Sequence, residues 1–339
     1  MEFQAEKIKD LLIAIGHGVQ KHIHHSLHAQ SIAERTAVAE EHRDDTIFQI
    51  DRDVESIILP MLYNHAESLG GIVLVAEGIS EESIVVFPET MREEDAAVRI
   101  IMDPIDGSRG IMYDKRSAFY LAGAAPNRPP EQTLNDIQTA VMVELPTSRA
   151  YLFDILWAVR GEGAHRVTHN IHTEKEEPKP ITPSKADSIL GGFGQISRFF
   201  PPGKEILAAI EEELIATLFP DPPAGKAILF NDQYISSGGQ LYELLTGHDR
   251  FVADLRASLY TCLKKEGKWV GLTCHPYDVC AHLIGQEAGI IITDIAGNPF
   301  NAPMNTHADV DWIAYANARI QKEVEPMLLG LFEKYGMGE

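Results

Sequence analysis

Five short apolar segments follow one another between residues 71 and 159, and they restrict the chain to folds built around a sheet. The apolar run of GIVLVAEG stops at Glu77, AVRIIMD ends at Asp103, and SAFYLAGAAP, TAVMVEL and AYLFDILWAV follow with turn residues between them. Segments of this length and composition, bounded by turn residues, predict buried strands. The first half of the chain is therefore expected to form a sheet with an acidic residue at two strand ends.

Helical patterns surround these strands. Apolar residues recur at helical spacing from Phe3 to Leu27 and again over residues 51–68, where Asp51 stands at the N-cap position and Pro60 predicts a bend. In the second half the patterns predict a strand in ILGGF, helices over 203–218, GGQLYELLTG and VCAHLIGQEAG, and a strand in IIITDIAGNPF. Interleaved helices and strands indicate an α/β or α+β chain with a layered architecture.

Residues 172–188, HTEKEEPKPITPSKADS, are polar, contain prolines and show no periodicity. They predict the connection between two halves of the chain. A chain of 339 residues is long enough for about two domains. We expect an N-terminal domain over residues 1–180, with most of the acidic candidate residues, and a smaller C-terminal domain over residues 181–339.

The charge and cysteine content exclude several classes of partner. The formal net charge of -21 argues against nucleic acid or an anionic membrane as the main partner. No apolar run approaches the length of a membrane span, and the N-terminus has no secretion signal pattern. Three cysteines are too few for a disulfide framework. We expect a cytoplasmic protein, for which a small anionic substrate stays possible because metal ions reverse the local field.

The segment RIIMDPIDGSRG places Asp103 and Asp106 on one tight turn after a strand. Two carboxylates so close together repel unless a positive charge lies between them. Pro104 favours an extended Asp103, and Pro104 and Gly107 suit a turn into a helix, whose first amides, on Gly107 and Ser108, would bind phosphate. A hard cation, Mg²⁺, would bind the carboxylates. The turn is a candidate metal and phosphate site.

Two other interpretations of this turn stay open at this point. The same residues would also form an ordinary turn in which the two aspartates only cap backbone amides. Haloacid-dehalogenase phosphatases carry Asp-x-Asp-Gly-Thr at a strand end, with the first aspartate as nucleophile. Asp103 and Asp106 are three residues apart, which does not fit that spacing.

An ordered set of motifs resembles the inositol monophosphatase superfamily. The set comprises Asp51, Glu77 at a strand end, DPIDGS with Asp103 and Asp106, WAVRGEGA, SSGGQLYELLTGHDRF, and YDVCA with Asp278. The family contains magnesium-dependent, often lithium-sensitive phosphatases of phosphorylated polyols, sugars and nucleotides. The resemblance implies a layered αβαβα fold and a homodimer.

By position, the resemblance implies the metal ligands. Glu77, Asp103 and the backbone carbonyl of Ile105 would bind one Mg²⁺. Asp103, Asp106 and Asp278 would bind a second, with two or three ions in the site. Two metal ions can activate water and neutralise phosphoryl oxygens, so this chemistry needs no protein nucleophile.

The resemblance also implies roles in catalysis and in substrate binding. Asp51 and Ser108, together with Glu77, would orient and activate the attacking water. The substrate would contact Asp106, Gly107, Ser108, Arg109, Ser237 and Asp278.

The sequence departs from the family pattern at three positions. Gly78 stands where relatives have the second of two glutamates, and Tyr277 replaces a tryptophan. Gly271 stands where inositol-specific relatives have a glutamate that binds the sugar ring. These departures make inositol phosphate a less secure substrate than the motif set alone would suggest.

The resulting prediction is a Mg²⁺-dependent phosphomonoesterase that acts on an inositol phosphate or a sugar phosphate. Arg109, Lys115 and Arg116 follow the predicted phosphate site and would suit a second anionic group. A sugar bisphosphatase or a 3′-phosphonucleotide phosphatase is therefore the alternative. A non-catalytic relative that binds a phosphorylated ligand is the alternative of another class.

Two further features have two interpretations each. His24 and His28 are four residues apart in a predicted helix, as a metal site or a solvated polar face would have them. Ser236 and Ser237 precede a predicted helix, where they would either contact the substrate or cap the helix.

Overall fold

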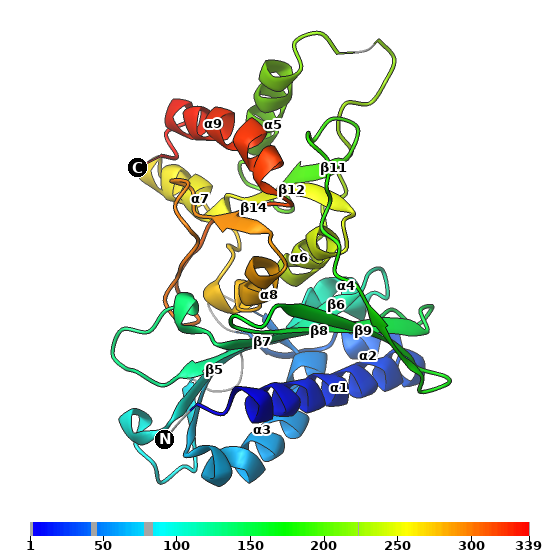
Figure 1. Ribbon diagram of the computed structural model, residues 1–339, viewed down its shortest axis with the longest axis vertical. Helices are drawn as coiled ribbons and strands as arrows, with labels where there is room; N and C mark the ends of the chain where they lie inside the picture. Colours follow the sequence, from blue (N-terminus) through cyan, green and yellow to red (C-terminus); the bar gives the residue numbers. More distant parts are fainter. Residues whose placement is uncertain (1–2, 42–45, 78–83, 223, 339) are drawn as a thin grey trace.

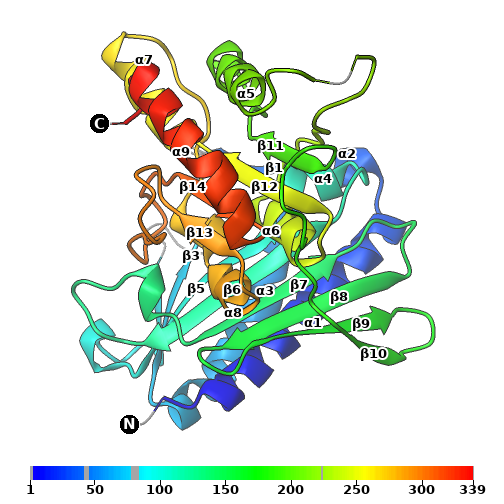
Figure 2. The same cartoon turned by 45° about the horizontal axis from the view of Figure 1, so that its top comes forward.

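The computed structural model describes residues 3–41, 46–77, 84–222 and 224–338. Helices and sheets alternate in five layers, as Figures 1 and 2 show. The layers are, in order, α1 (Ala5–Ala29) with α3 (Gln49–Leu69), an eight-stranded sheet, α6 (Ser237–Leu245) with α8 (His282–Glu287), a four-stranded sheet, and α5 (Lys204–Leu218) with α7 (Arg256–Lys265) and α9 (Ala318–Lys334). This arrangement confirms the expected αβαβα architecture.

The eight-stranded sheet has the order β10-β9-β8-β7-β6-β5-β3-β4, and each neighbouring pair is antiparallel except β3 with β5. The strands are β3 (Ile72–Ala76), β4 (Ile84–Phe87), β5 (Val98–Asp106), β6 (Ala118–Pro126), β7 (Thr139–Leu145), β8 (Leu152–Val159), β9 (Ala164–Asn170) and β10 (Glu176–Lys179). All five strands predicted between residues 71 and 159 are present.

The predicted connection over residues 172–188 is partly wrong, because it contains β10. This strand pairs with β9 at the edge of the sheet. Its sequence, EEPK, is polar because an edge strand held by backbone hydrogen bonds needs no buried side chains. The division into domains at residue 180 stays a prediction.

The central strands β3, β5, β6 and β7 are buried along almost their whole length because both faces of the large sheet are covered there. In β5, Ile100 and Met102 belong to the core shared with α1 and α3, whereas Ile101 belongs to the core between the two sheets. This alternation is the two-residue period of a strand. The helix α1 approaches closely at Gly16, where a Cβ atom would lie 2.6 Å from both Tyr120 and Val143.

The second predicted helix begins earlier than expected. Asp51 lies in the first turn of α3, which starts at Gln49, so the N-cap prediction for Asp51 is wrong. The helix continues past Pro60 to Leu69. A short antiparallel pair, β1 (Val38–Glu41) and β2 (Thr46–Phe48), and the short helix α2 (Ile32–Arg35) lie between α1 and α3 in the chain.

The four-stranded sheet has the order β11-β12-β14-β13. Its strands are β11 (Phe193–Ile196), β12 (Asp249–Asp254), β13 (Ile291–Thr293) and β14 (Trp312–Tyr315). The strand predicted in ILGGF begins only at Phe193, because Gly191 has a positive φ of 70° and the chain turns there. In the described part of the chain, no helix is long and apolar enough to cross a membrane.

Candidate metal centre

Asp103 and Asp106 face the same side of the large sheet because β5 contains a bulge. The prediction that the strand ends at Asp103 is wrong, since β5 continues to Asp106. Asp103 pairs with Leu121 of β6 and Asp106 pairs with Phe119, so three steps along β5 match two along β6. Residues three apart on a regular strand point to opposite faces. The extra residue turns both carboxylates to one face.

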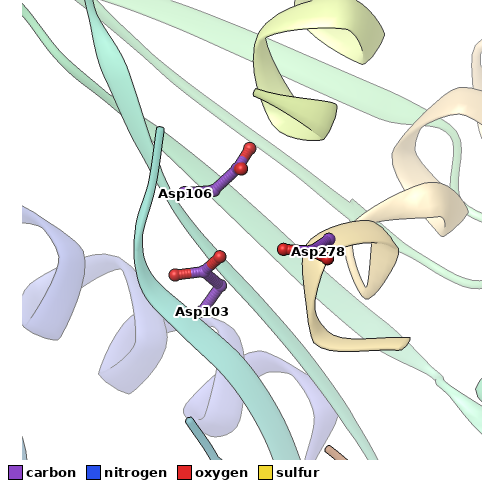
Figure 3. Close-up of side chains that lie close together, drawn as sticks. All are labelled: Asp103, Asp106 and Asp278. Atoms are coloured by element: carbon purple, nitrogen blue, oxygen red, sulfur yellow. The ribbon is translucent and has the colours of Figure 1, made fainter. Parts of the chain in front are cut away.

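Asp278 completes the group from the second half of the chain. It lies in the 3₁₀ helix η3 (Pro276–Val279). The α-helix α8, which the sequence predicts from Val279, begins only at His282. One carboxylate oxygen each of Asp103, Asp106 and Asp278 lie within 4.8 Å of one another. Figure 3 shows Asp278 facing the two aspartates of β5 from the opposite side. The structure thus brings together three of the predicted metal ligands.

Hydrogen bonds hold one oxygen of each carboxylate. Asp103 Oδ1 accepts from the Ile105 amide at 2.9 Å, and Asp278 Oδ2 accepts from the His275 amide at 2.6 Å. Asp106 Oδ2 accepts from the Ser236 hydroxyl at 2.7 Å and the Gly238 amide at 2.5 Å. These hydrogen bonds fix the orientation of the three carboxylates.

The electrostatics of the cluster favour a bound cation. Burial, with the added charges of Asp106, Asp278 and Glu77, raises the pKa of Asp103 well above its usual 3.8. Burial also raises the pKa of Asp106 to about 6, and burial with the charge of Asp106 raises that of Asp278 to about 7. Hard divalent cations prefer such clusters of carboxylate oxygens, so these residues fit Mg²⁺.

The nearby cation Arg256 does not neutralise the cluster by itself. Arg256 opens α7 and lies almost fully buried against Asp254 of β12, with Nη2 2.7 Å from Oδ2 and Nε 2.9 Å from Oδ1. Its charge favours the ionised forms of Asp106 and Asp278. Because Asp254 already pairs with it, the three aspartates still carry an excess of negative charge.

Glu77 connects the two halves through Tyr277. Glu77 directly follows β3, as predicted, and is not one of the three carboxylates within 4.8 Å of one another. The Tyr277 hydroxyl donates to Glu77 Oε1 at 2.8 Å. The tyrosine that replaces the family's tryptophan thus positions a predicted metal ligand. A sequence gives no signal for a pair 200 positions apart.

The segment after the bulge forms the predicted helix start. Gly107 has a positive φ of 92° and precedes α4 (Ser108–Met112). The Ser108 hydroxyl donates to the Ile105 carbonyl at 2.8 Å. A carbonyl oxygen has two lone pairs, so this contact still leaves Ile105 able to bind a metal ion. Arg109 is exposed on α4.

Two positions of the predicted site cannot be placed. The side chain of Asp51 lies outside the described part of the structure, although its backbone belongs to α3. Gly78, which replaces the second glutamate of the family pattern, also lies outside the described residues. Their roles stay predictions.

Ser236 and Ser237, at the start of α6, make different contacts. Ser236 caps the helix by accepting from the Gly239 amide at 2.8 Å, which confirms the capping interpretation, and it also bonds to Asp106. Ser237 is buried, and its hydroxyl lies 3.6 Å from Cys274 Sγ. Ser236 and Gly238 therefore orient Asp106 in the candidate metal centre, a role that the sequence pattern does not indicate.

Arg116, the last of the three cations after Asp106, contacts residues around α6. Arg116 pairs with Asp232 at 2.6 Å and with Glu243 at 3.4 Å, and its guanidinium lies 3.7 Å from the Tyr234 ring centre. Arg116 thus links the segment after α4 to the residues around α6. Lys115 is exposed.

Gly271 lies in a tight position. A Cβ atom there would lie 3.0 Å from the Tyr260 hydroxyl and 3.2 Å from the Pro201 carbonyl oxygen. A side chain at this position would require these neighbours to shift by a few tenths of an ångström.

The three cysteines are free, and Cys274 and Cys280 are buried, as expected for reduced thiols.

No protein-family model matches the sequence, and no curated protein matches it significantly. Solved structures match it along almost its whole length. The extragenic suppressor protein suhB from Bartonella henselae is 15% identical, with a TM-score of 0.62, and the match covers 95% of this chain and 98% of that one. Fructose-1,6-bisphosphatase from Leishmania major is 13% identical, with a TM-score of 0.65, over 95% and 94% of the chains.

Inositol monophosphatase from Anabaena is 13% identical, with a TM-score of 0.58, over 97% of this chain and 96% of the other. These likenesses establish the fold. It is the fold of the inositol monophosphatase and fructose-1,6-bisphosphatase structures, as the motif resemblance predicted.

Proposed function

We propose that this protein is a Mg²⁺-dependent phosphomonoesterase that hydrolyses a small phosphorylated metabolite. The observation that carries the proposal is the convergence of three carboxylates from both halves of the chain, the buried Asp103 and Asp106 and the half-buried Asp278. Their raised pKa values mark a site with too much negative charge for its surroundings. A divalent cation would remove this excess.

The chain's own residues would hold two or three Mg²⁺ ions. Asp103, Asp106 and Asp278 would bind directly, and Glu77 and the Ile105 carbonyl would complete the set. When bound, Mg²⁺ supplies a water of lowered pKa and neutralises phosphoryl oxygens. The Tyr277 hydroxyl would keep Glu77 oriented, and Ser236 and Gly238 would keep Asp106 oriented.

The remaining roles concern water and phosphate. Ser108, with Asp51, would orient the attacking water, and the water would take the place of a protein nucleophile. The amides of Gly107 and Ser108, at the start of α4, would donate to the phosphate oxygens. His282 borders the same cavity as Asp278, and burial lowers its pKa to about 4. His282 would therefore be neutral near pH 7 and would not protonate the leaving group.

The substrate would be an inositol phosphate or a sugar phosphate, and the surroundings of Gly271 favour the sugar phosphate. The glutamate that binds inositol in specific relatives has no counterpart there, and Tyr260 and Pro201 occupy the adjoining space. A bisphosphate or a 3′-phosphonucleotide is the second candidate, because Arg109 and Lys115 are exposed cations near the predicted phosphate site. We also propose a homodimer in the cytoplasm.

The test is phosphate release from a substrate panel. The panel contains inositol monophosphates, hexose monophosphates, fructose 1,6-bisphosphate and 3′-phosphoadenosine 5′-phosphate, each with Mg²⁺, with chelator, and with Mg²⁺ plus lithium. Turnover that requires Mg²⁺ supports the proposal, and the preferred compound identifies the substrate class. Mg²⁺ binding without turnover of any compound would instead favour a non-catalytic phosphate-binding protein.

A further inference from the structure

A pair of histidines lies on α1, on the other side of the large sheet from the aspartates. His24 and His28 are four residues apart in α1, so their side chains project from the same face of the helix. Their ring centres are 4.6 Å apart, with one ring edge-on to the other. His24 is half-buried and His28 is exposed, so both can reach an ion from solvent.

A third histidine comes from a segment far away in the sequence. His172 lies in the turn between β9 and β10. Figure 2 shows these two strands at the edge of the large sheet. The Asn170 side chain accepts from the amides of His172 and Thr173, both at 3.0 Å, and the Tyr151 ring stacks against His172 with ring centres 6.2 Å apart. The turn therefore presents His172 from a fixed backbone.

His28 and His172 both lie close enough to His24 for their charges to act on it. Burial lowers the pKa of His24, and the charges of His28, His172 and His25 lower it further.

We propose that His24 and His28, with His172 as the third ligand, form a surface site for Zn²⁺. Two histidines at this helical spacing are a known zinc-binding arrangement, and imidazole nitrogen suits Zn²⁺ better than Mg²⁺. Bound Zn²⁺ joins the C-terminal part of α1 to the turn that holds the edge strand β10. A net charge of -21 raises the local concentration of cations near the protein.

One rearrangement completes the site. In the described residues, only the three aspartates form a group of three or more His, Cys, Asp or Glu side chains with ligand atoms within 4.8 Å of one another. The nitrogens of the three histidines therefore do not all lie within that distance of one another. The histidine ligands therefore converge through a change of side-chain rotamer. His28 and His172 are exposed, so their rings can turn without disturbing the core.

The experiment is a calorimetric titration of the full-length protein with Zn²⁺ in excess Mg²⁺, together with the H24A/H28A variant. The aspartates are intact in both proteins, so any Zn²⁺ that binds there contributes equally. We expect the wild-type protein to bind one more equivalent of Zn²⁺ than H24A/H28A. Equal stoichiometry and affinity in the two proteins would overturn the proposal.

His25→Ala is the matched control. It removes an exposed imidazole from the same helical turn, but its side chain projects about 100° away around the helix. H25A should still bind the additional equivalent of Zn²⁺ with wild-type affinity, and H172A should bind it more weakly. Loss in H25A would overturn the assignment of ligands, and unchanged affinity in H172A would overturn the third ligand. Circular dichroism checks folding, and Mg²⁺-dependent phosphate release should be the same in all variants.

Discussion

Gly238→Ala should damage the metal centre without removing any ligand. A Cβ atom on Gly238 would lie 2.9 Å from Asp106 Oδ2 and 2.8 Å from Leu121 Cδ2. Ordinary contacts between such atoms are about 3.5–4.0 Å, so the carboxylate has to move by roughly 0.6–1 Å. The Gly238 amide donates to the same oxygen at 2.5 Å. A movement of that size weakens this hydrogen bond and misplaces Asp106 as a ligand.

The effect on metal binding should exceed the effect on stability. Changes to groups that orient metal ligands typically lower metal affinity by about 10–100-fold. Overpacking lowers the free energy of unfolding by about 1–3 kcal/mol, whereas replacing a helical glycine by alanine raises it by about 0.5–1 kcal/mol. We therefore expect a loss of stability of about 2 kcal/mol or less, together with a rise of at least about tenfold in the Mg²⁺ concentration needed for half-maximal binding.

The assays are Mg²⁺ titration by calorimetry and urea unfolding in the presence of chelator. Gly330→Ala is the matched control, because Gly330 lies in α9 with no heavy atom within 4 Å of its Cβ position. The free energy of unfolding of that variant should rise by about 0.5–1 kcal/mol, and its Mg²⁺ affinity should equal that of the wild-type protein. An unchanged Mg²⁺ affinity in G238A would refute the argument that Gly238 positions Asp106.

Three further predictions concern the carboxylates. Tyr277→Phe removes the hydroxyl that donates to Glu77, so the Mg²⁺ midpoint of phosphate release should rise about tenfold while urea unfolding changes little; an unchanged midpoint would show that this hydrogen bond does not matter. Burial raises the pKa of Glu144 to about 7, so the folded protein keeps a proton that the unfolded chain releases near pH 4.5. Glu144 alone should lower stability by up to about 3 kcal/mol between pH 4.5 and 7, and Glu144→Gln should remove this share while the other buried carboxylates keep theirs; equal pH profiles in urea unfolding would contradict it. Mg²⁺ at about 100 times its dissociation constant should stabilise the wild-type protein by about 2.7 kcal/mol, and Asp103→Asn should lose most of that gain in a thermal melt; an equal gain in both proteins would exclude Asp103 as a ligand.

Local patterns in the sequence were enough to predict most of the large sheet. The apolar runs that end at Glu77 and Asp103 are strands because each side chain on them is buried by a layer above or below the sheet. The polar strand β10 escaped prediction because backbone pairing alone holds it at the edge.

The candidate site was only partly predictable, because its geometry depends on contacts between distant segments. The bulge that brings Asp103 and Asp106 to one face depends on register with β6. The approach of Asp278 was inferred from the motif resemblance and not from spacing. The contacts of Ser236 with Asp106 and of Tyr277 with Glu77 join residues more than 100 positions apart, and no local pattern predicts them.

The measurement that tests the central claim most directly is phosphate release as a function of Mg²⁺ concentration, for the wild-type protein and Asp278→Asn. Of the three clustered aspartates, Asp278 is the candidate ligand that the second half of the chain supplies. The account predicts saturable, Mg²⁺-dependent release by the wild-type protein, and release lowered by orders of magnitude in D278N while the fold is retained. Release that is independent of Mg²⁺, or equal in the two proteins, would contradict it.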